Sequence, residues 1–250
     1  MKTRDKVLNI ALPIITVAVL VVLWVIAAQA VNSAYVLPTV GETVAALFGL
    51  FKSAEFYAAY FNTLLRSVIA FFISFALAFI FAFFAYKSEK ARRALKPLIV
   101  IIRALPTIAV VLLLVLWTSS KVAPIIVTML VVFPTLYNNL YAALSGIDKD
   151  LNEMCKVFGI SEKKRLKKVV FPQIAPEFIS AAGAGLTLNL KLMVAAEVLA
   201  QTARSFGYLL NTSKIYFEIS TMLALVLITV ITGLIIEFLF SFWAKKAVKR

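Results

Sequence analysis

Two ionisable side chains inside one long apolar run, Lys191 and Glu197, carry the most informative chemistry in the sequence. An ionisable group inside a lipid bilayer costs about 2.5–3.5 kcal/mol on insertion scales, so each should face protein or water. Lys191 can line a path and attract an anion, or it can pair with a carboxylate or with backbone carbonyls. The two residues lie six positions apart, about 240° around a helix, so a straight helix does not pair them. Glu197 is consistent with either a ligand or a helix-packing group.

Prolines interrupt other apolar runs. Pro106 and Pro134 break backbone hydrogen-bond ladders, which is tolerated where neighbouring helices or cavity water satisfy the freed carbonyls. Both are therefore candidates for the wall of a path, and equally for simple kinks. Arg103 lies about one turn inside its run and can extend its guanidinium to lipid headgroups. The small residues 181–185 suit close helix contact, either within the chain or with a second copy.

The residue types that are missing exclude several chemistries. The sequence has no histidine, which excludes an imidazole base, a histidine metal ligand and a Ser-His-Asp triad. Its one cysteine, Cys155, cannot form an internal disulfide or a thiolate zinc site. No segment matches G-x-x-x-x-G-K-[ST], the phosphate-binding loop of P-loop ATPases. We therefore predict that the chain is not an enzyme and that it holds no metal or cofactor of its own.

The elements that position these residues follow from composition. Hydrophobic residues make up 62% of the 250 residues, against about 45–50% in soluble domains, and charged residues 15%, against about 25%. The mean hydropathy of +0.97 also indicates a chain that is too apolar for a soluble domain. The apolar runs are too long for the ten-residue alternation of an outer-membrane barrel. We predict an all-α membrane protein with about six transmembrane helices, at residues 10–31, 67–86, 98–117, 122–144, 178–201 and 219–243.

The distribution of basic residues predicts the orientation of these spans. Of the 26 Lys and Arg, three precede the first span, five lie between the second and third, seven between the fourth and fifth, and four follow the sixth, so 19 share one side. Five fall on the other side and two within spans. This split places residues 1–9, the loop 145–176 and the tail 244–250 in the cytoplasm, with both termini inside and 10–243 as the membrane domain. It also explains the net charge of +14 without nucleic acid.

The N-terminal segment has a second interpretation. A basic start, an apolar run and the A-x-A pattern at residues 28–30 resemble a secretory signal. Its apolar run is longer than the 7–15 residues of such signals, and its removal would leave five spans and an unexplained basic patch. We therefore expect the segment to be retained as the first span.

The long loop 145–176 reads as a helix–turn–helix elbow. Its first helix carries an apolar stripe at positions i, i+3, i+4 and i+7. The stripe consists of Leu151, Met154, Cys155 and Phe158. Gly159 would permit a tight reversal, Ser161 would cap a second helix, and Pro172 would end it. The apolar face can pack on the chain's own spans, lie on anionic headgroups, or dock into a groove of a soluble partner.

The same loop resembles the cytoplasmic signature of ABC-type importer permeases, E-A-A, three residues, G, nine residues, I-x-L-P. The matching residues are Glu153, Gly159, Val169, Phe171 and Pro172. Met154 and Cys155 replace the two alanines, while Val169 and Phe171 replace isoleucine and leucine, so all four departures remain apolar.

Further segments, between about Leu37 and Phe240, resemble the nitrate/sulfonate/taurine branch of that family. They are Leu37-Pro38-Thr39, Arg103-Ala104-Leu105-Pro106 with Trp117, Phe133-Pro134 and Ala195-Ala196-Glu197. One departure is that Thr118 to Ser120 stand where the branch has glycines after the tryptophan.

The resemblance implies a type I ABC importer permease in the bacterial or archaeal cytoplasmic (inner) membrane. It implies a homodimer with a second permease copy, ABC ATPase subunits that bind ATP and Mg, and an extracytoplasmic solute-binding protein. The residues it places in the ATPase-coupling elbow are Glu153, Met154, Cys155, Phe158, Gly159 and Pro172. The solutes of the branch are nitrate, sulfonates, taurine, bicarbonate and thiamine-precursor pyrimidines, and Lys191 favours an anion.

Two other classes stay open. A self-sufficient channel or secondary carrier would need no ATPase, but its halves should show repeat symmetry, which the sequence lacks. An intramembrane enzyme would have to work without histidine.

Overall fold

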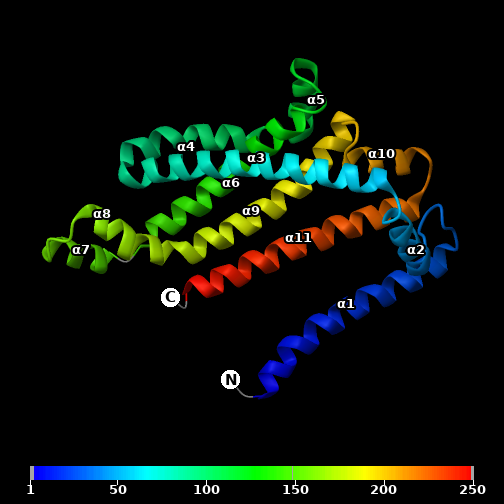
Figure 1. The fold of residues 1–250 in the computed structure, drawn as a ribbon, viewed down its shortest axis with the longest axis horizontal. Helices are drawn as coiled ribbons and strands as arrows, with labels where there is room; N and C mark the ends of the chain where they lie inside the picture. The colour runs from blue at the N-terminus through cyan, green and yellow to red at the C-terminus, as the bar shows by residue number, and fades with distance from the viewer. Residues whose placement is uncertain (1–2, 148, 249–250) are drawn as a thin grey trace.

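The computed structural model describes residues 3–147 and 149–248, and its regular secondary structure there is helical throughout. Figure 1 shows the order of the helices along the chain. They are α1 (Thr3–Val31), α2 (Val40–Leu50), α3 (Ala54–Lys87), α4 (Glu89–Ala104), α5 (Thr107–Trp117), α6 (Ala123–Ser145), α7 (Lys149–Val157), α8 (Glu162–Arg165), a π-helical segment (Leu166–Val170), α9 (Phe171–Ala200), α10 (Phe206–Ile215) and α11 (Ile219–Val248).

Five of the described helical stretches are long and apolar enough to cross a membrane. They are Ala11–Val31, α3, α6, the continuous stretch Glu162–Ala200 and Ile219–Ala247. The pair α4 and α5 makes a sixth candidate if it forms one bent span. The chain is therefore a multi-pass helical membrane protein, and the predicted fold class is confirmed.

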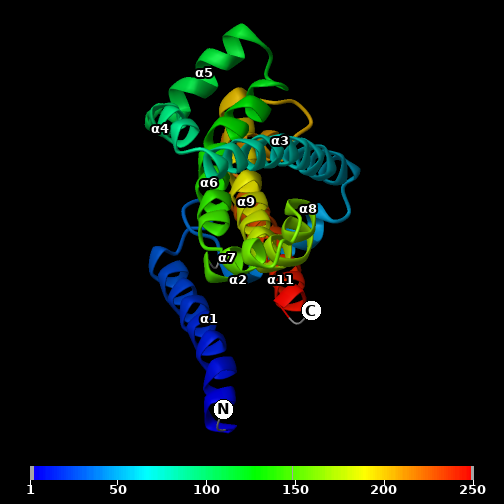
Figure 2. The same ribbon diagram turned by 90° about the vertical axis from the view of Figure 1, so that its left-hand side faces the viewer.

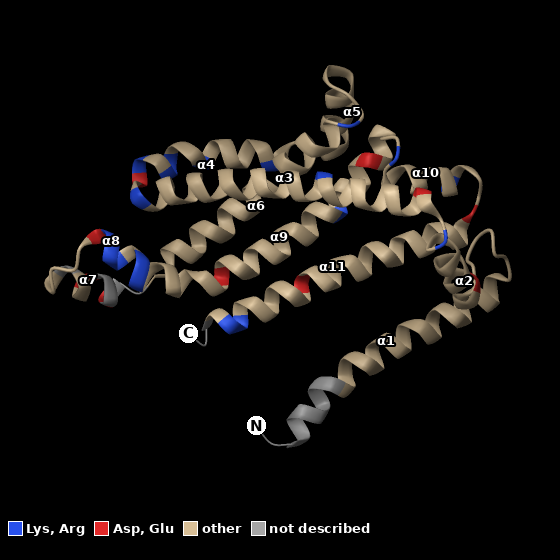
Figure 3. Cartoon of the chain, viewed as in Figure 1, with Lys and Arg blue, Asp and Glu red and all other residues tan. Residues whose placement is uncertain are grey.

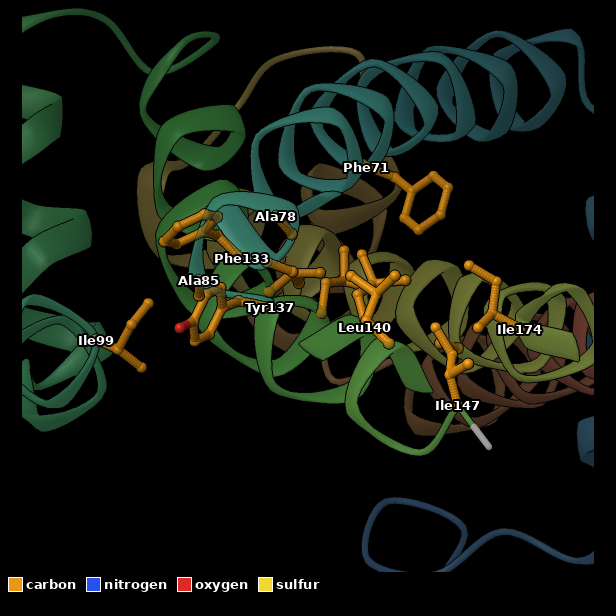
Figure 4. Close-up of a cluster of buried hydrophobic side chains, with 14 of the residues drawn as sticks. Phe71, Ala78, Ala85, Ile99, Phe133, Tyr137, Leu140, Ile147 and Ile174 are labelled. Atoms are coloured by element: carbon orange, nitrogen blue, oxygen red, sulfur yellow. The ribbon is translucent and has the colours of Figure 1, made fainter. Parts of the chain in front are cut away.

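Helix α9 lies at the centre of the bundle and contacts α3, α6 and α11 (Figure 1). The largest buried cluster joins α3, α6 and α9 through side chains such as Phe71, Leu140 and Ile174 (Figure 4). Small residues on α9 make this close packing possible: a Cβ on Gly183 would meet Phe240 of α11 at 2.5 Å, and one on Gly185 would meet Leu136 of α6 at 2.6 Å. Gly183 and Gly185 of the small-residue patch thus serve helix contacts within the chain, whereas Ala184 is exposed.

Helix α1 stands away from this bundle. Helix α1 extends separately from the other spans in both views (Figures 1 and 2), and its apolar side chains are largely exposed. It is tied to the start of α2, where the indole Nε1 of Trp24 donates to the carbonyl oxygen of Pro38 (3.0 Å). The next residue, Thr39, caps α2 through a capping box with Glu42. The Leu-Pro-Thr segment is therefore the N-terminal cap of a short helix that the sequence did not predict.

The predicted span 98–117 is broken in the structure. Helices α4 and α5 meet at an angle of 89°, with Leu105 and Pro106 in extended conformation between them. Proline lacks an N–H and disfavours helical geometry at the residue before it, so this break follows from Pro106. Helix α5 projects from the bundle as a result (Figure 2).

The second span begins much earlier than predicted. Helix α3 starts at Ala54 rather than at residue 67, because Ser53 caps it by accepting a hydrogen bond from the N–H of Phe56 (3.3 Å). Arg66 was counted among the basic residues outside the spans. It lies instead within α3.

The prediction that Pro172 ends a helix is wrong. Helix α8, the π-helical segment and α9 form one continuous helical stretch, and Pro172 lies in the first turn of α9. Just before it, the N–H of Phe171 donates to the carbonyl of Leu166, five residues back. This wider turn shifts the hydrogen-bond register, so that the missing N–H of Pro172 does not stop the helix.

Basic side chains gather at one end of the bundle. They cluster at the α3–α4 turn, on α8 and in the last turn of α11 (Figure 3). The elbow α7–α8 lies at the same end of the bundle (Figure 1). Lys2, Lys249 and Arg250, which belong to the predicted cytoplasmic segments, lie outside the described residues. The opposite end, with α2 and α10, has few basic residues in the described part of the chain.

Candidate functional site

Glu197 is fully buried between α3, α9 and α10. Its Oε1 accepts a hydrogen bond from Nε of Arg66 (2.8 Å), and Nη2 of Arg66 lies 2.7 Å from the same oxygen. Its Oε2 accepts from Oγ1 of Thr63 (2.8 Å) and from the main-chain N–H of Gly207 (3.3 Å). Both carboxylate oxygens are therefore engaged by the chain itself, as a charge buried in a membrane protein requires.

The same cluster joins α3 to the start of α10. The N–H of Phe206 donates to Oγ1 of Thr63 (2.9 Å), while Oγ of Ser205 accepts from the N–H of Tyr208 and so caps α10. The approach is so close that a Cβ on Gly207 would lie 2.5 Å from Cβ of Glu197. The Arg66–Glu197 cluster thus fixes the end of α9 against two other helices.

Lys191 lies on a different face of α9 and is exposed. No salt bridge involves it among the described residues. The exposed positions of α9 also include Glu177, Ser180 and Ala184, which recur at helical spacing toward Lys191. We call these four residues the α9 stripe. They are far more polar than a surface that faces lipid, so the stripe should face water or another protein.

A cavity of about 580 Å³ lies between α6 and the first three residues of the α9 stripe, Glu177, Ser180 and Ala184. Its lining is mostly small or polar, with Asn139 and Ala142 from α6 facing Glu177, Ser180 and Ala184 from α9. Lys191 lies two turns further along the same face of α9. The stripe and the cavity together place the carboxylate of Glu177, the hydroxyl of Ser180 and the ammonium group of Lys191 along one face of a membrane-length helix.

The prolines singled out in the sequence occupy different environments. Pro106 is exposed at the bend between α4 and α5. Pro134 is buried inside α6, where it packs within the helical bundle. Of the four predicted path residues, Pro106 and Lys191 are therefore accessible in this structure, whereas Pro134 and Glu197 are enclosed.

The elbow forms as the sequence pattern predicts. Helix α7 ends at Val157, and the N–H of Ile160 donates to the carbonyl of Cys155 (2.9 Å), closing the turn. Gly159 has a φ of +63°, the left-handed conformation that side-chain-bearing residues rarely adopt. Ser161 precedes α8 as expected, although its side chain makes no capping hydrogen bond.

The apolar stripe of the elbow divides into two parts. Cys155 is buried, while the side chains of Met154 and Phe158 are exposed, together with the neighbouring Val157. Val157 and Phe158 are 83% and 74% exposed, values that leave almost their whole apolar surface available to a partner. Glu153 is also exposed, and the side chain of Leu151 lies outside the described residues.

Sequence reasoning missed Arg66, Thr63 and Gly207. Arg66 was set outside the second span because the hydropathy rises only after it. Two signals in the sequence point to Arg66. A buried Glu197 needs a cationic partner, and Lys191 is on the wrong side of the helix to serve. Ser53 and Glu55 mark a helix start well before Arg66, which places Arg66 inside that helix. Thr63 and Gly207 carry no such signal, because their roles arise from contacts between distant segments.

These features define a class of protein, a multi-pass helical membrane protein that presents an exposed apolar elbow beyond its membrane spans. The chain belongs to the family of binding-protein-dependent transport system inner membrane components, whose sequence model matches residues 74–250. It is a permease component of an ABC importer.

Relatives within the family include the putative aliphatic sulfonates transport permease protein SsuC of Bacillus subtilis, 25% identical over 218 residues, covering 86% of this chain and 79% of the relative. The taurine transport system permease protein TauC of Escherichia coli is 23% identical over 236 residues, covering 92% and 86%. The resemblance to this branch, inferred from short motifs, is confirmed.

Solved structures support the fold. An inward-facing structure of the MetNI methionine ABC transporter matches with a TM-score of 0.64 and 19% identity, covering 76% of this chain and 94% of that one. A chain from an amino acid ABC transporter solved with histidines matches with a TM-score of 0.66 and 15% identity, covering 77% and 94%. The likeness concerns the arrangement of the helices.

Proposed function

We propose that this permease carries a small anion, and that the α9 stripe with the facing surface of α6 lines its path. The observation that carries the proposal is Lys191, an exposed cation without a salt bridge among the described residues, on a polar stripe in the interior of a membrane span. A cation there lowers the energy of an anion that has left bulk water. The names of the sulfonate and taurine relatives support an anion that carries a sulfonate or similar group.

The path needs a second wall. In one copy of the chain the α9 stripe lies on the surface of the bundle, so a second permease copy, as a homodimer, would close it. The polar character of the stripe supports this arrangement, because an exposed face of this kind is unfavourable in contact with lipid. A solute-binding protein outside the membrane would deliver the anion, as the family description implies.

The orientation follows from charge. The end of the bundle with the α3–α4 turn, α8 and the last turn of α11 holds most of the described basic residues, and the positive-inside rule would place that end in the cytoplasm of a bacterial or archaeal cell. Both termini and the elbow would then face the cytoplasm.

The elbow would bind a separate ATPase subunit, which would hold ATP and Mg. Val157 and Phe158 supply an exposed apolar anchor, Met154 an adaptable neighbour, and Gly159 the reversal that presents them. Glu153 would add a charged contact at the rim, Cys155 would support the elbow from within, and Pro172 would lie at the exposed start of α9 beside it. Rigid-body movement of the two elbows in a dimer would open the path in turn to the cytoplasm and to the outside of the membrane.

Substitution of Phe158 by aspartate is expected to weaken ATPase binding about thirtyfold or more, because a buried aromatic anchor contributes about 2 kcal/mol or more to an interface. Folding should be unaffected, since the side chain is mostly exposed. The measurement is ATPase co-purified with the full-length permease. Tyr216→Asp is the matched control, because Tyr216 is 71% exposed in the turn between α10 and α11 at the opposite end. Equal ATPase retention by both variants would contradict the role of the elbow.

Lys191→Gln is expected to reduce anion uptake about tenfold or more, because a charge-assisted contact contributes about 1.5–3 kcal/mol. Uptake would be measured in proteoliposomes holding the complete transporter, with labelled taurine, ethanesulfonate, nitrate and bicarbonate. Lys214→Gln, at the end of α10, is the control for loss of one positive charge. The anion proposal fails if the wild type moves none of these solutes, or if Lys191→Gln transports them at the wild-type rate.

A further inference from the structure

A second cavity, of about 490 Å³, lies between α4 and α6, away from the α9 stripe. Its lining begins at Glu89 and Arg92, beside the α3–α4 turn where basic side chains gather (Figure 3). Its lining comes from nearly the whole length of α4 and from the second half of α6. The charged and polar lining residues are Glu89, Arg92, Arg93, Lys96, Arg103, Tyr137, Asn138 and Tyr141.

The charges of this cavity do not balance. Four cations line it against one carboxylate. Glu89 is already occupied, since its oxygens accept from Nε and Nη2 of Arg92 (2.7 and 2.6 Å) and from Nε of Arg93 (3.1 Å). Lys96 and Arg103 have no salt bridge among the described residues, so the cavity keeps a net positive charge.

The sequence spacing explains why the cations converge. Arg92, Lys96 and Arg103 lie at positions i, i+4 and i+11 of α4, and Ile99 at i+7 completes the same face. Ile99 is buried and forms an apolar floor. Arg92, Lys96 and Arg103 therefore share the side of α4 that faces the cavity, and Arg93 lies next to that side.

Helix α6 supplies the neutral side of the cavity. Tyr137 and Tyr141 are one turn apart with their rings stacked at 6.2 Å between centroids, and Asn138 lies beside Tyr137. Hydroxyl and amide groups can donate hydrogen bonds to an oxyanion that the cations attract. The combination of guanidinium, ammonium and neutral donors is the chemistry that binds phosphate-type groups.

The surroundings of the cavity indicate where such a group comes from. Between Lys96 and Arg103, α4 exposes Leu98, Val100 and Ile101, of which the last two are 57% and 60% exposed. Val100 also lines the cavity itself. A basic cavity that borders an exposed apolar surface has the geometry of the boundary between lipid headgroups and acyl chains.

We propose that the cavity between α4 and α6 binds a phosphate-type oxyanion, and that the headgroup of an anionic phospholipid supplies it. The headgroup phosphate would contact Lys96 and Arg103, while an acyl chain would lie along the exposed Val100, which lines the same cavity. The site is separate from the solute path and would hold the α4–α6 contact at the membrane surface.

Native mass spectrometry of the full-length permease tests this proposal, with phosphatidylglycerol and phosphatidylcholine offered at equal concentration. The wild type is expected to retain phosphatidylglycerol preferentially. The double variant Lys96→Gln, Arg103→Gln should bind it about thirtyfold more weakly, roughly 2 kcal/mol for two cations near an anionic lipid. Lys245→Gln, Lys246→Gln is the matched control, since it removes the same charge from the exposed last turn of α11.

The outcomes distinguish a lipid headgroup from a soluble anion and from general attraction by surface charge. Equal loss of phosphatidylglycerol in both double variants would overturn the proposal, because it would mean general attraction by surface charge. A second arm adds inorganic phosphate and ethanesulfonate to the permease in phosphatidylcholine alone, with thermal stability as readout. Stabilisation that requires Lys96 and Arg103 there, without preferential lipid retention, would assign the site to a soluble anion. No dependence on these two residues in either arm would remove the site.

Discussion

Replacement of Arg66 by methionine is expected to lower the free energy of unfolding by about 3–5 kcal/mol, the largest effect of any single substitution considered for this chain. The carboxylate of Glu197 is fully buried, and Arg66 is its cationic partner at 2.7 Å. Without that partner Glu197 would be an uncompensated charge inside the bundle. The measurement is reversible unfolding of the full-length permease in mixed micelles.

Two comparisons separate this effect from loss of a long side chain. The double variant Arg66→Met, Glu197→Met removes both charges and should recover much of the lost stability, since a buried ion pair can often be replaced by apolar residues. Lys87→Met removes one partner of the exposed pair Lys87–Glu162 and should change stability far less, because water screens that pair. A double variant as unstable as Arg66→Met alone would refute the charge argument.

Alanine at position 207 is expected to destabilise the chain by about 3 kcal/mol through overpacking. Its Cβ would lie 2.6 Å from the main-chain nitrogen of Val198 and 2.5 Å from Cβ of Glu197. Backbone atoms cannot rotate away, so α10 would have to move off α9, and the Gly207 N–H to Glu197 hydrogen bond would lengthen with it.

Gly49→Ala provides the matched comparison, because nothing lies within 4 Å of a Cβ built on Gly49 in α2. Alanine there should be neutral or stabilise by up to about 1 kcal/mol, as alanine favours a helix over glycine. Thermal unfolding of both variants in the same detergent compares them. Equal melting temperatures for the two alanine variants would contradict the packing of α10 on α9.

The elements that could be predicted from the sequence are those set by local pattern. Long apolar runs gave α6 and α11 nearly to their ends, and the spacing from Glu153 to Gly159 predicted an elbow whose glycine has the left-handed conformation. The proline in the apolar run predicted an interruption at Pro106, but the sequence did not predict the 89° angle between α4 and α5.

The features that the sequence could not give depend on contacts between distant segments. Arg66 meets Glu197 across 131 positions, and no periodicity within α3 or α9 reports that pairing. Pro172 failed as a stop signal because the π-helical segment before it changes the hydrogen-bond register, a feature of backbone geometry rather than of composition.

The unbroken helix from Glu162 to Ala200 has a mechanical consequence. Its 39 residues extend about 58 Å, so it would act as a lever with the elbow at one end. The other tip is pinned by the Arg66–Glu197 cluster. A tilt of about 10° around that pinned tip would swing the elbow sideways by roughly 10 Å, given about 1.5 Å of rise per residue. A small rotation near the Arg66–Glu197 cluster would therefore give a large displacement at the elbow.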